Sequence, residues 1–128
     1  MPNGARGESL LQVGDQEYHI LFTNRALASA EQRTGKSVMQ LATQATNNQL
    51  SVTDIAALLL VGLEAGRLDA RSGGHPWDLS KAYRVMDEVG FMRVSIAVLE
   101  GIAAVISYDP EILPGEGGED EDDASPPG

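Results

Sequence analysis

Apolar and polar positions alternate with a period of two near the start of the chain, in two short runs on either side of Gly14 and Asp15. The apolar positions of these runs are Leu11 and Val13 in the first, and Tyr18, Ile20 and Phe22 in the second. This alternation around a glycine-containing turn pair predicts a β-hairpin. Because a lone hairpin is only marginally stable in water, its apolar face must pack on the rest of the fold or on a partner.

After the hairpin the apolar positions recur every three or four residues, which predicts helices. We expect three of them, bounded by capping residues at the start and by glycine or asparagine at the end. Their expected limits are Thr23 or Asn24 to Gly35, Ser37 to Asn47 and Asn48, and Ser51 to Gly66.

A segment without helical periodicity, "RLDARSGGHPWD", follows these helices and is expected to be a loop that projects Trp77. A fourth helix is then predicted from a cap at Asp78 or Ser80 through Val89, and Gly90 separates it from a fifth. The predicted fold is mainly α with an N-terminal β-hairpin (α+β), a small bundle of about five helices. We expect a flexible start at 1–7, the hairpin and helical domain at 8–108, and a disordered acidic tail at 109–128.

The last predicted helix lies in "VGFMRVSIAVLEGIAAVISY" and is apolar over an unusually wide arc. At about 100° per residue, Arg93, Glu100 and Ser107 form one narrow stripe, and apolar residues cover roughly 200° of the rest. One apolar flank can pack on the core of the domain, while the other must be covered by something else to be shielded from water. That cover is either the remaining helices of the same domain, or another chain.

If another chain covers this flank, the helix is a protein-binding surface. Trp77 is a further candidate for a partner contact, although a tryptophan packed back onto the domain explains it equally well. The candidate partner-binding residues are Phe91, Met92, Ile96, Leu99, Ile102, Ile106 and Trp77.

Charge is distributed unevenly along the 128 residues, whose formal net charge is -10. Residues 109–128 hold eight acidic residues and no basic one, so the rest of the chain is close to neutral. Without a basic patch, binding to nucleic acid or to an anionic membrane is disfavoured. The tail itself is expected to keep the protein in solution, or to attract a basic partner.

The composition also limits the chemistry that is available. The chain has no cysteine, which fits a reducing, intracellular setting, and its first residues lack the apolar core of a signal peptide, so we expect a cytoplasmic protein. His19 and His75 have no neighbour at metal-ligand spacing, and Glu64 and Asp69 are expected to be solvated helix charges. We therefore expect no enzyme activity, no cofactor and no metal site.

The order of these elements resembles the small tail assembly chaperones of long-tailed phages and gene transfer agents, a family sometimes described as tail tube related. The resemblance lies in "FTNRALASAEQRTGKSVMQL", "LSVTDIAALLLVGLEAG" and "VMDEVG" before an apolar helix and an acidic end. It implies a host-cytoplasmic assembly factor that binds the tape measure protein and recruits tail tube subunits. Such a factor is expected to be absent from the mature particle.

The alternative function is a structural tail tube or connector subunit of the particle. Rings of tube subunits usually close by sheet pairing, and the sequence predicts only one hairpin. A small DNA-binding regulator would need a basic recognition helix, and none of the predicted helices supplies one. Self-association remains open in either tail function.

Overall fold

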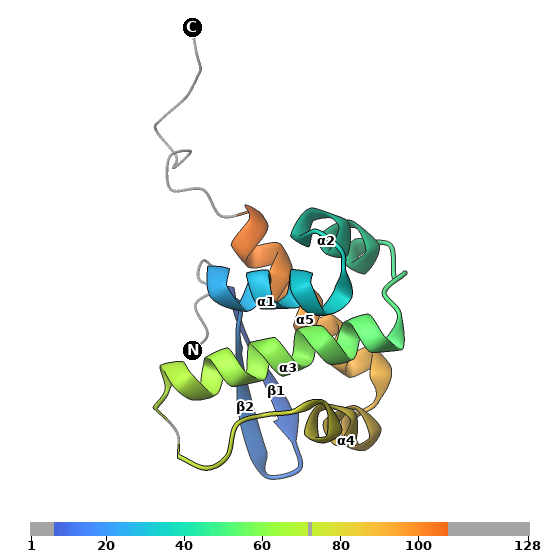
Figure 1. Ribbon diagram of the computed structural model, residues 1–128. Coiled ribbons are helices and arrows are strands. Elements are labelled where there is room, and N and C mark those ends of the chain that lie inside the picture. The colour runs from blue at the N-terminus through green and yellow to red at the C-terminus, as the bar shows by residue number, and fades with distance from the viewer. Residues whose placement is uncertain (1–6, 72, 108–128) are drawn as a thin grey trace, which may run out of the picture.

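The computed structural model of the chain describes residues 7–71 and 73–107 (Figure 1). Its elements in order are β1 (Glu8–Val13), β2 (Gln16–Leu21), α1 (Asn24–Thr34), α2 (Val38–Thr46), α3 (Val52–Asp69), α4 (Leu79–Val89) and α5 (Phe91–Ser107). A two-stranded antiparallel hairpin followed by five helices confirms the predicted fold class for these residues. The acidic tail and all but the last residue of the expected flexible start lie outside the described residues.

The hairpin forms in the register that the alternation predicts. Leu11 pairs with Tyr18 and Val13 with Gln16 across the strands, and Gly14 makes the turn with a φ of 60°. Leu11 and Ile20 are buried on the face that packs against the helices. The hairpin is thus stabilised by the helical layer behind it and not by its strand pairing alone.

The central element is α3, which contacts β2, α1, α4 and α5. All of its residues from 54 to 63 are buried, so the helix is enclosed over most of its circumference. The prediction that α3 ends at Gly66 is wrong, because the helix continues to Asp69 and Ala70 is its C-cap. Gly66 serves a different purpose, since a side chain there would overlap the carbonyl group of His19 in β2.

The starts of four helices follow the capping pattern of the sequence. In each, a side-chain oxygen accepts a hydrogen bond of 2.8 to 3.1 Å from the backbone N–H three residues on. The capping residues are Thr23, Ser37, Ser51 and Asp78. Each bond satisfies an N–H group that the helix leaves unpaired, an effect of about 1 kcal/mol per cap.

An ion pair between half-buried Lys36 and buried Asp54 joins the segment between α1 and α2 to the start of α3. Lys36 Nζ lies 2.6 Å from Asp54 Oδ2 and also donates to Gln44 Oε1 at 3.1 Å. Asp54 is only 5% exposed, so removing its cationic partner would leave a carboxylate without compensation.

None of the described helices is by itself long and apolar enough to cross a membrane. By length and composition α4 and α5 pass that test together, but their axes are bent by 115° at the break between them.

We predict that Gly66→Ala lowers the free energy of unfolding by about 2–3 kcal/mol, because the new methyl group would overlap a backbone carbonyl that has little freedom to move. Gly73→Ala is the control, since a Cβ at Gly73 meets no atom within 4 Å, and its effect should stay within about 0.5 kcal/mol. Urea unfolding followed by far-ultraviolet circular dichroism measures both values. Equal midpoints for the two variants would contradict the close packing of α3 on β2.

Candidate partner-binding surfaces

One flank of α5 is exposed, and three of the predicted partner-binding residues, Met92, Ile96 and Leu99, lie there. Met92 is 59% exposed, Ile96 53% and Phe91 38%, while Leu99 is half-buried beside them. We call these four residues the α5 ridge. The exposure of Met92 and Ile96 follows from the helical period, since Val94, Val98 and Ile102 repeat every four residues on the opposite flank and are fully buried. Phe91 shares the flank of Val98 and Ile102 by this period and is exposed as the first residue of the helix.

Two of the candidate residues on α5 lie elsewhere. Ile102 is 1% exposed and belongs to the core, so its side chain offers no surface to a partner. The physical reason is that Ile102 shares a face with Val94 and Val98, which packs on the domain. Ile106 is half-buried and packs against the same core.

A small pocket of about 60 Å³ borders the α5 ridge. Leu50 and Ala45, from the α2 end of the domain, line it together with the ridge. Ser95 also lines the pocket, and its buried Oγ makes no hydrogen bond within the described part of the chain. The ridge therefore stands beside a shallow apolar recess with one unsatisfied hydroxyl group.

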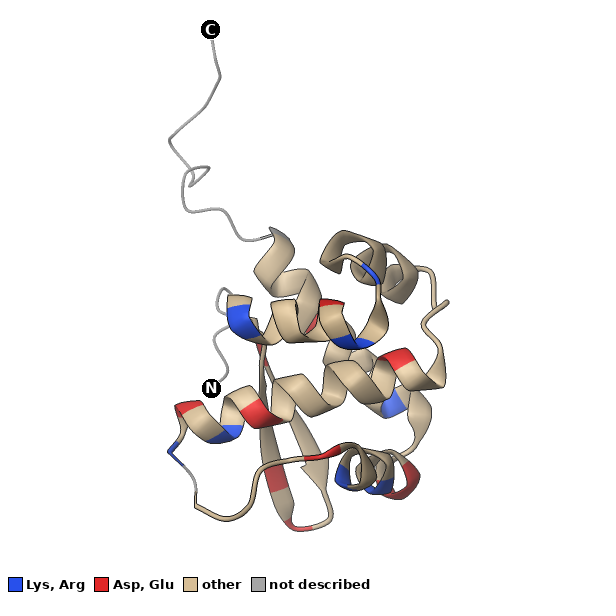
Figure 2. Cartoon of the chain, viewed as in Figure 1, with Lys and Arg blue, Asp and Glu red and all other residues tan. Residues whose placement is uncertain are grey.

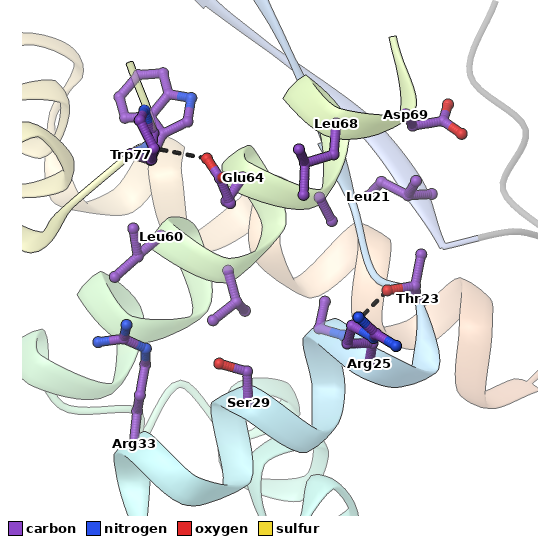
Figure 3. Close-up of a pocket in the computed structure, with 14 residues that line it drawn as sticks. Leu21, Thr23, Arg25, Ser29, Arg33, Leu60, Glu64, Leu68, Asp69 and Trp77 are labelled. Carbon is purple, nitrogen blue, oxygen red and sulfur yellow. Dashed lines mark hydrogen bonds between the residues drawn. The ribbon is translucent and has the colours of Figure 1, made fainter. Parts of the chain in front are cut away.

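A larger groove of about 600 Å³ runs between α1 and α3 (Figure 3). Most of its surface is apolar and comes from the facing sides of the two helices and from the end of β2. The apolar residues that line it are Leu21, Ala26, Leu60, Val61, Ala65, Leu68, Pro76 and Trp77. We call this feature the α1–α3 groove.

Two arginines stand on the α1 wall of the groove. Arg25, Ser29 and Arg33 are spaced four residues apart and therefore lie along one side of the helix. Both arginines are exposed, and neither forms an ion pair with the acidic groups that the structure describes. Figure 3 shows both arginines on α1 with Ser29 between them, and Figure 2 shows basic positions towards both ends of this helix.

On the α3 wall, Glu64 holds the loop after α3 in place. Its carboxylate accepts hydrogen bonds from Arg67 Nε at 3.0 Å, from Arg67 Nη2 at 2.7 Å and from the backbone N–H of Trp77 at 2.9 Å. The Arg67 hydrogen bonds lower the pKa of Glu64 most, burial opposes them, and the Trp77 N–H lowers it further. The prediction that Glu64 is a merely solvated helix charge is therefore wrong.

Trp77 lines the groove and packs on the domain at the same time. Its ring meets Tyr18 of the hairpin edge to face, with centroids 5.2 Å apart and planes at 88°. It is half-buried, so part of the indole remains available at the groove. The two explanations that the sequence left open for Trp77 are compatible in this geometry.

Among the described residues, one group could hold a metal ion by distance. Glu8, His19 and Asp69 each offer a ligand atom, and these atoms lie within 4.8 Å of one another. Glu8 Oε2 and His19 Nε2 are already in contact at 2.7 Å, and Glu8 is buried. The contact satisfies a buried carboxylate without a metal, and the expected absence of a metal site stays a prediction.

The α1–α3 groove was not predicted from the sequence. One signal was present, because arginines at i and i+8 with a serine between them and alanine beside them mark a charged edge next to small residues. However, the packing of α1 against α3 is tertiary structure, which a local sequence pattern does not predict.

A family model described as "Phage tail tube protein, GTA-gp10" matches residues 6–80. No curated protein and no solved structure matches the chain. The matched segment contains every residue that lines the α1–α3 groove, whereas α5 lies beyond it.

We predict that Glu64→Gln destabilises the domain by about 1 kcal/mol at neutral pH, because an amide cannot replace both charge-assisted bonds from Arg67. The folded pKa of Glu64 is lowered, so its stabilising effect is complete above the unfolded value of 4.5 and is lost as the pH falls through the folded pKa. The difference between the wild-type protein and the variant should shrink accordingly in acid.

Urea unfolding followed by Trp77 fluorescence at several pH values measures this difference. Glu88→Gln, at an exposed position of α4, is the matched control and should leave stability unchanged. A Glu64→Gln effect that persists undiminished in acid would show that the carboxylate charge is not its source.

Proposed function

The chain belongs to the family of phage tail tube proteins described as GTA-gp10, and on that basis we propose that it acts in building the tail tube by binding other tail proteins through the α5 ridge. Family membership gives the chain a tail-related role. The ridge is the observation that carries the proposed mechanism, because Met92 and Ile96 stand exposed on one flank of α5 and Phe91 is exposed at the start of the helix.

Burial of such side chains is favourable by about 25 cal/mol for each Å² of apolar surface, before the cost of association is subtracted. A polar surface at the same place would offer no such gain. The recess beside Ser95 adds a position where a partner could fill a shallow cavity and pair with the hydroxyl group. These features support a protein partner more than a small molecule.

The first candidate role is a structural subunit of the tail tube. The family description names a tail tube protein, and it supports this role more directly than any other. In this role the α5 ridge would be buried against neighbouring subunits in the finished tube.

The second candidate role is a tail assembly chaperone that binds the tape measure protein and recruits tube subunits. Two observations favour it: the described residues contain a single two-stranded sheet, which leaves few strands for closing a ring by sheet pairing, and the ridge is uncovered in the monomer. A chaperone would act in the host cytoplasm and would leave before the particle is complete.

Mass spectrometry of purified particles distinguishes the two roles. We expect a tube subunit to be present in an amount comparable with the main tail proteins, and a chaperone to be absent although deleting its gene abolishes tails. A protein that is both absent from particles and dispensable for tail formation would contradict the proposed function.

We predict that Met92→Gln weakens binding to co-expressed tail proteins about tenfold, because a polar amide replaces an apolar group that a partner would bury. Met39→Gln is the matched control: Met39 is 61% exposed against 59% for Met92, and it lies on the side of α2 away from buried Leu41. Quantitative co-purification gives the ratio, and circular dichroism confirms that both variants fold. Equal recovery of tail proteins with both variants would remove the ridge from the proposal.

A further inference from the structure

We propose that the α1–α3 groove is a second binding site, which receives an amphipathic helix of a partner protein with carboxylates along one edge. This site is separate from the α5 ridge and does not depend on which tail role the protein has. The groove is formed by α1, α3 and Trp77, and its occupant follows from three properties of its surface.

The first property is length. The groove follows α1 from Arg25 to Arg33 and α3 from Leu60 to Asp69, which corresponds to about 12–14 Å along each helix axis. A partner helix presents anchors at i, i+4 and i+7 over about 10–11 Å, so two turns of such a helix match the groove. A volume of about 600 Å³ accommodates several side chains, whereas one small polar ligand would leave most of it empty.

The second property is the shape of the floor. Small residues occupy the facing positions of the two helices, with Ala26 and Ser29 on α1 and Ala65 on α3. They allow a third helix to approach closely, while Leu60 and Leu68 provide apolar contacts along α3. Leu68 is 60% exposed, so the groove has apolar surface left to bury.

The third property is charge. Arg25 and Arg33 lie two helical turns apart on the α1 wall and have no acidic partner within the described residues. Two acidic residues line the other wall: Glu64 is already bound by Arg67 and Trp77, and the carboxylate of Asp69 lies within 4.8 Å of Glu8 and His19. The charge left unpaired on the α1 wall is thus positive, and guanidinium groups pair most strongly with carboxylates.

Two other occupants match these properties less well. The terminal acidic segment of the chain, "DPEILPGEGGEDEDD", carries eight carboxylates but only two large apolar side chains, Ile112 and Leu113, so it would leave most of the apolar floor uncovered. A second copy could insert its α5 ridge, but the polar edge of that helix carries Arg93 as well as Glu100, so it would bring one carboxylate and one further guanidinium to two arginines. A separate acidic amphipathic helix would cover the apolar floor with its apolar face and pair its carboxylates with the arginines of the α1 wall.

The test uses the full-length protein and two designed helical probe peptides. Both peptides have leucine at i, i+4, i+7 and i+11; one has glutamate and the other lysine along one edge of this stripe. The chain has a single tryptophan, Trp77 in the groove, so tryptophan emission reports binding at the site when the peptides lack tryptophan. We expect the glutamate peptide to bind at least about tenfold more tightly than the lysine peptide and to change the Trp77 emission.

Charge reversal then tests the two arginines. Arg25→Glu with Arg33→Glu should reverse the preference between the peptides, whereas Arg84→Glu with Arg93→Glu changes the net charge equally outside the groove and should leave the preference intact. Equal binding of both peptides, or a preference that survives reversal of Arg25 and Arg33, would overturn the proposal. So would binding that leaves the Trp77 emission unchanged.

Two further outcomes would assign the groove to a different occupant and thereby overturn the proposed partner. Binding of the glutamate peptide that appears only when the acidic residues of 109–123 are changed to amides would assign it to the chain's own terminal segment. A dimer that dissociates on reversal of Arg25 and Arg33 would assign it to a second copy. The Met92→Gln assay does not involve the groove, so the two proposals can fail independently.

Discussion

The close approach of α3 to β2 is the constraint on which the rest of the structure depends. Gly62 and Gly66 face the strand, where a Cβ on Gly62 would lie 2.6 Å from Ile20 Cγ2 and one on Gly66 would overlap the His19 carbonyl. Because these two positions have no side chain, α3 can pack close to the hairpin, and the apolar face of the hairpin is buried against it. The C-terminal turns of α3 then pass the edge of β2, and Glu64 reaches the Trp77 backbone. Trp77 in turn closes one side of the α1–α3 groove.

The exposed ridge follows from the composition of α5. The helix carries large apolar residues on two flanks, but only one flank can face a core that α3 already fills. Val94, Val98 and Ile102 take that place, and Met92 and Ile96 are left outside. An apolar surface of this kind is a liability in a free monomer unless a partner covers it or charge keeps the molecule soluble. This is the physical argument for a protein contact, and it holds for a tube subunit and for a chaperone alike.

Local patterns in the sequence predicted most of the fold. Ser37 and Ser51 were recognised as caps because the capping bond is made within three residues, and the hairpin register follows from alternation around Gly14. The end of α3 was predicted wrongly at Gly66, because a glycine that ends a helix cannot be distinguished in sequence from one that lets a neighbouring strand pack closely. The Glu64 contacts and the groove could not be predicted for a related reason. Each is formed by residues that come together only when α1, α3 and the loop before α4 pack against one another.

The two proposed surfaces rest on different kinds of support. The family match ends at residue 80 and so includes the groove but not the ridge. Membership in a tail tube family therefore bears on the elements that form the groove, namely α1, α3 and the segment that holds Trp77. The ridge rests on exposure and hydrophobicity alone. A chain with both surfaces can hold an acidic helix in one place and bury an apolar flank in another. Under the proposed function, two such contacts would serve a tube subunit and an assembly factor alike.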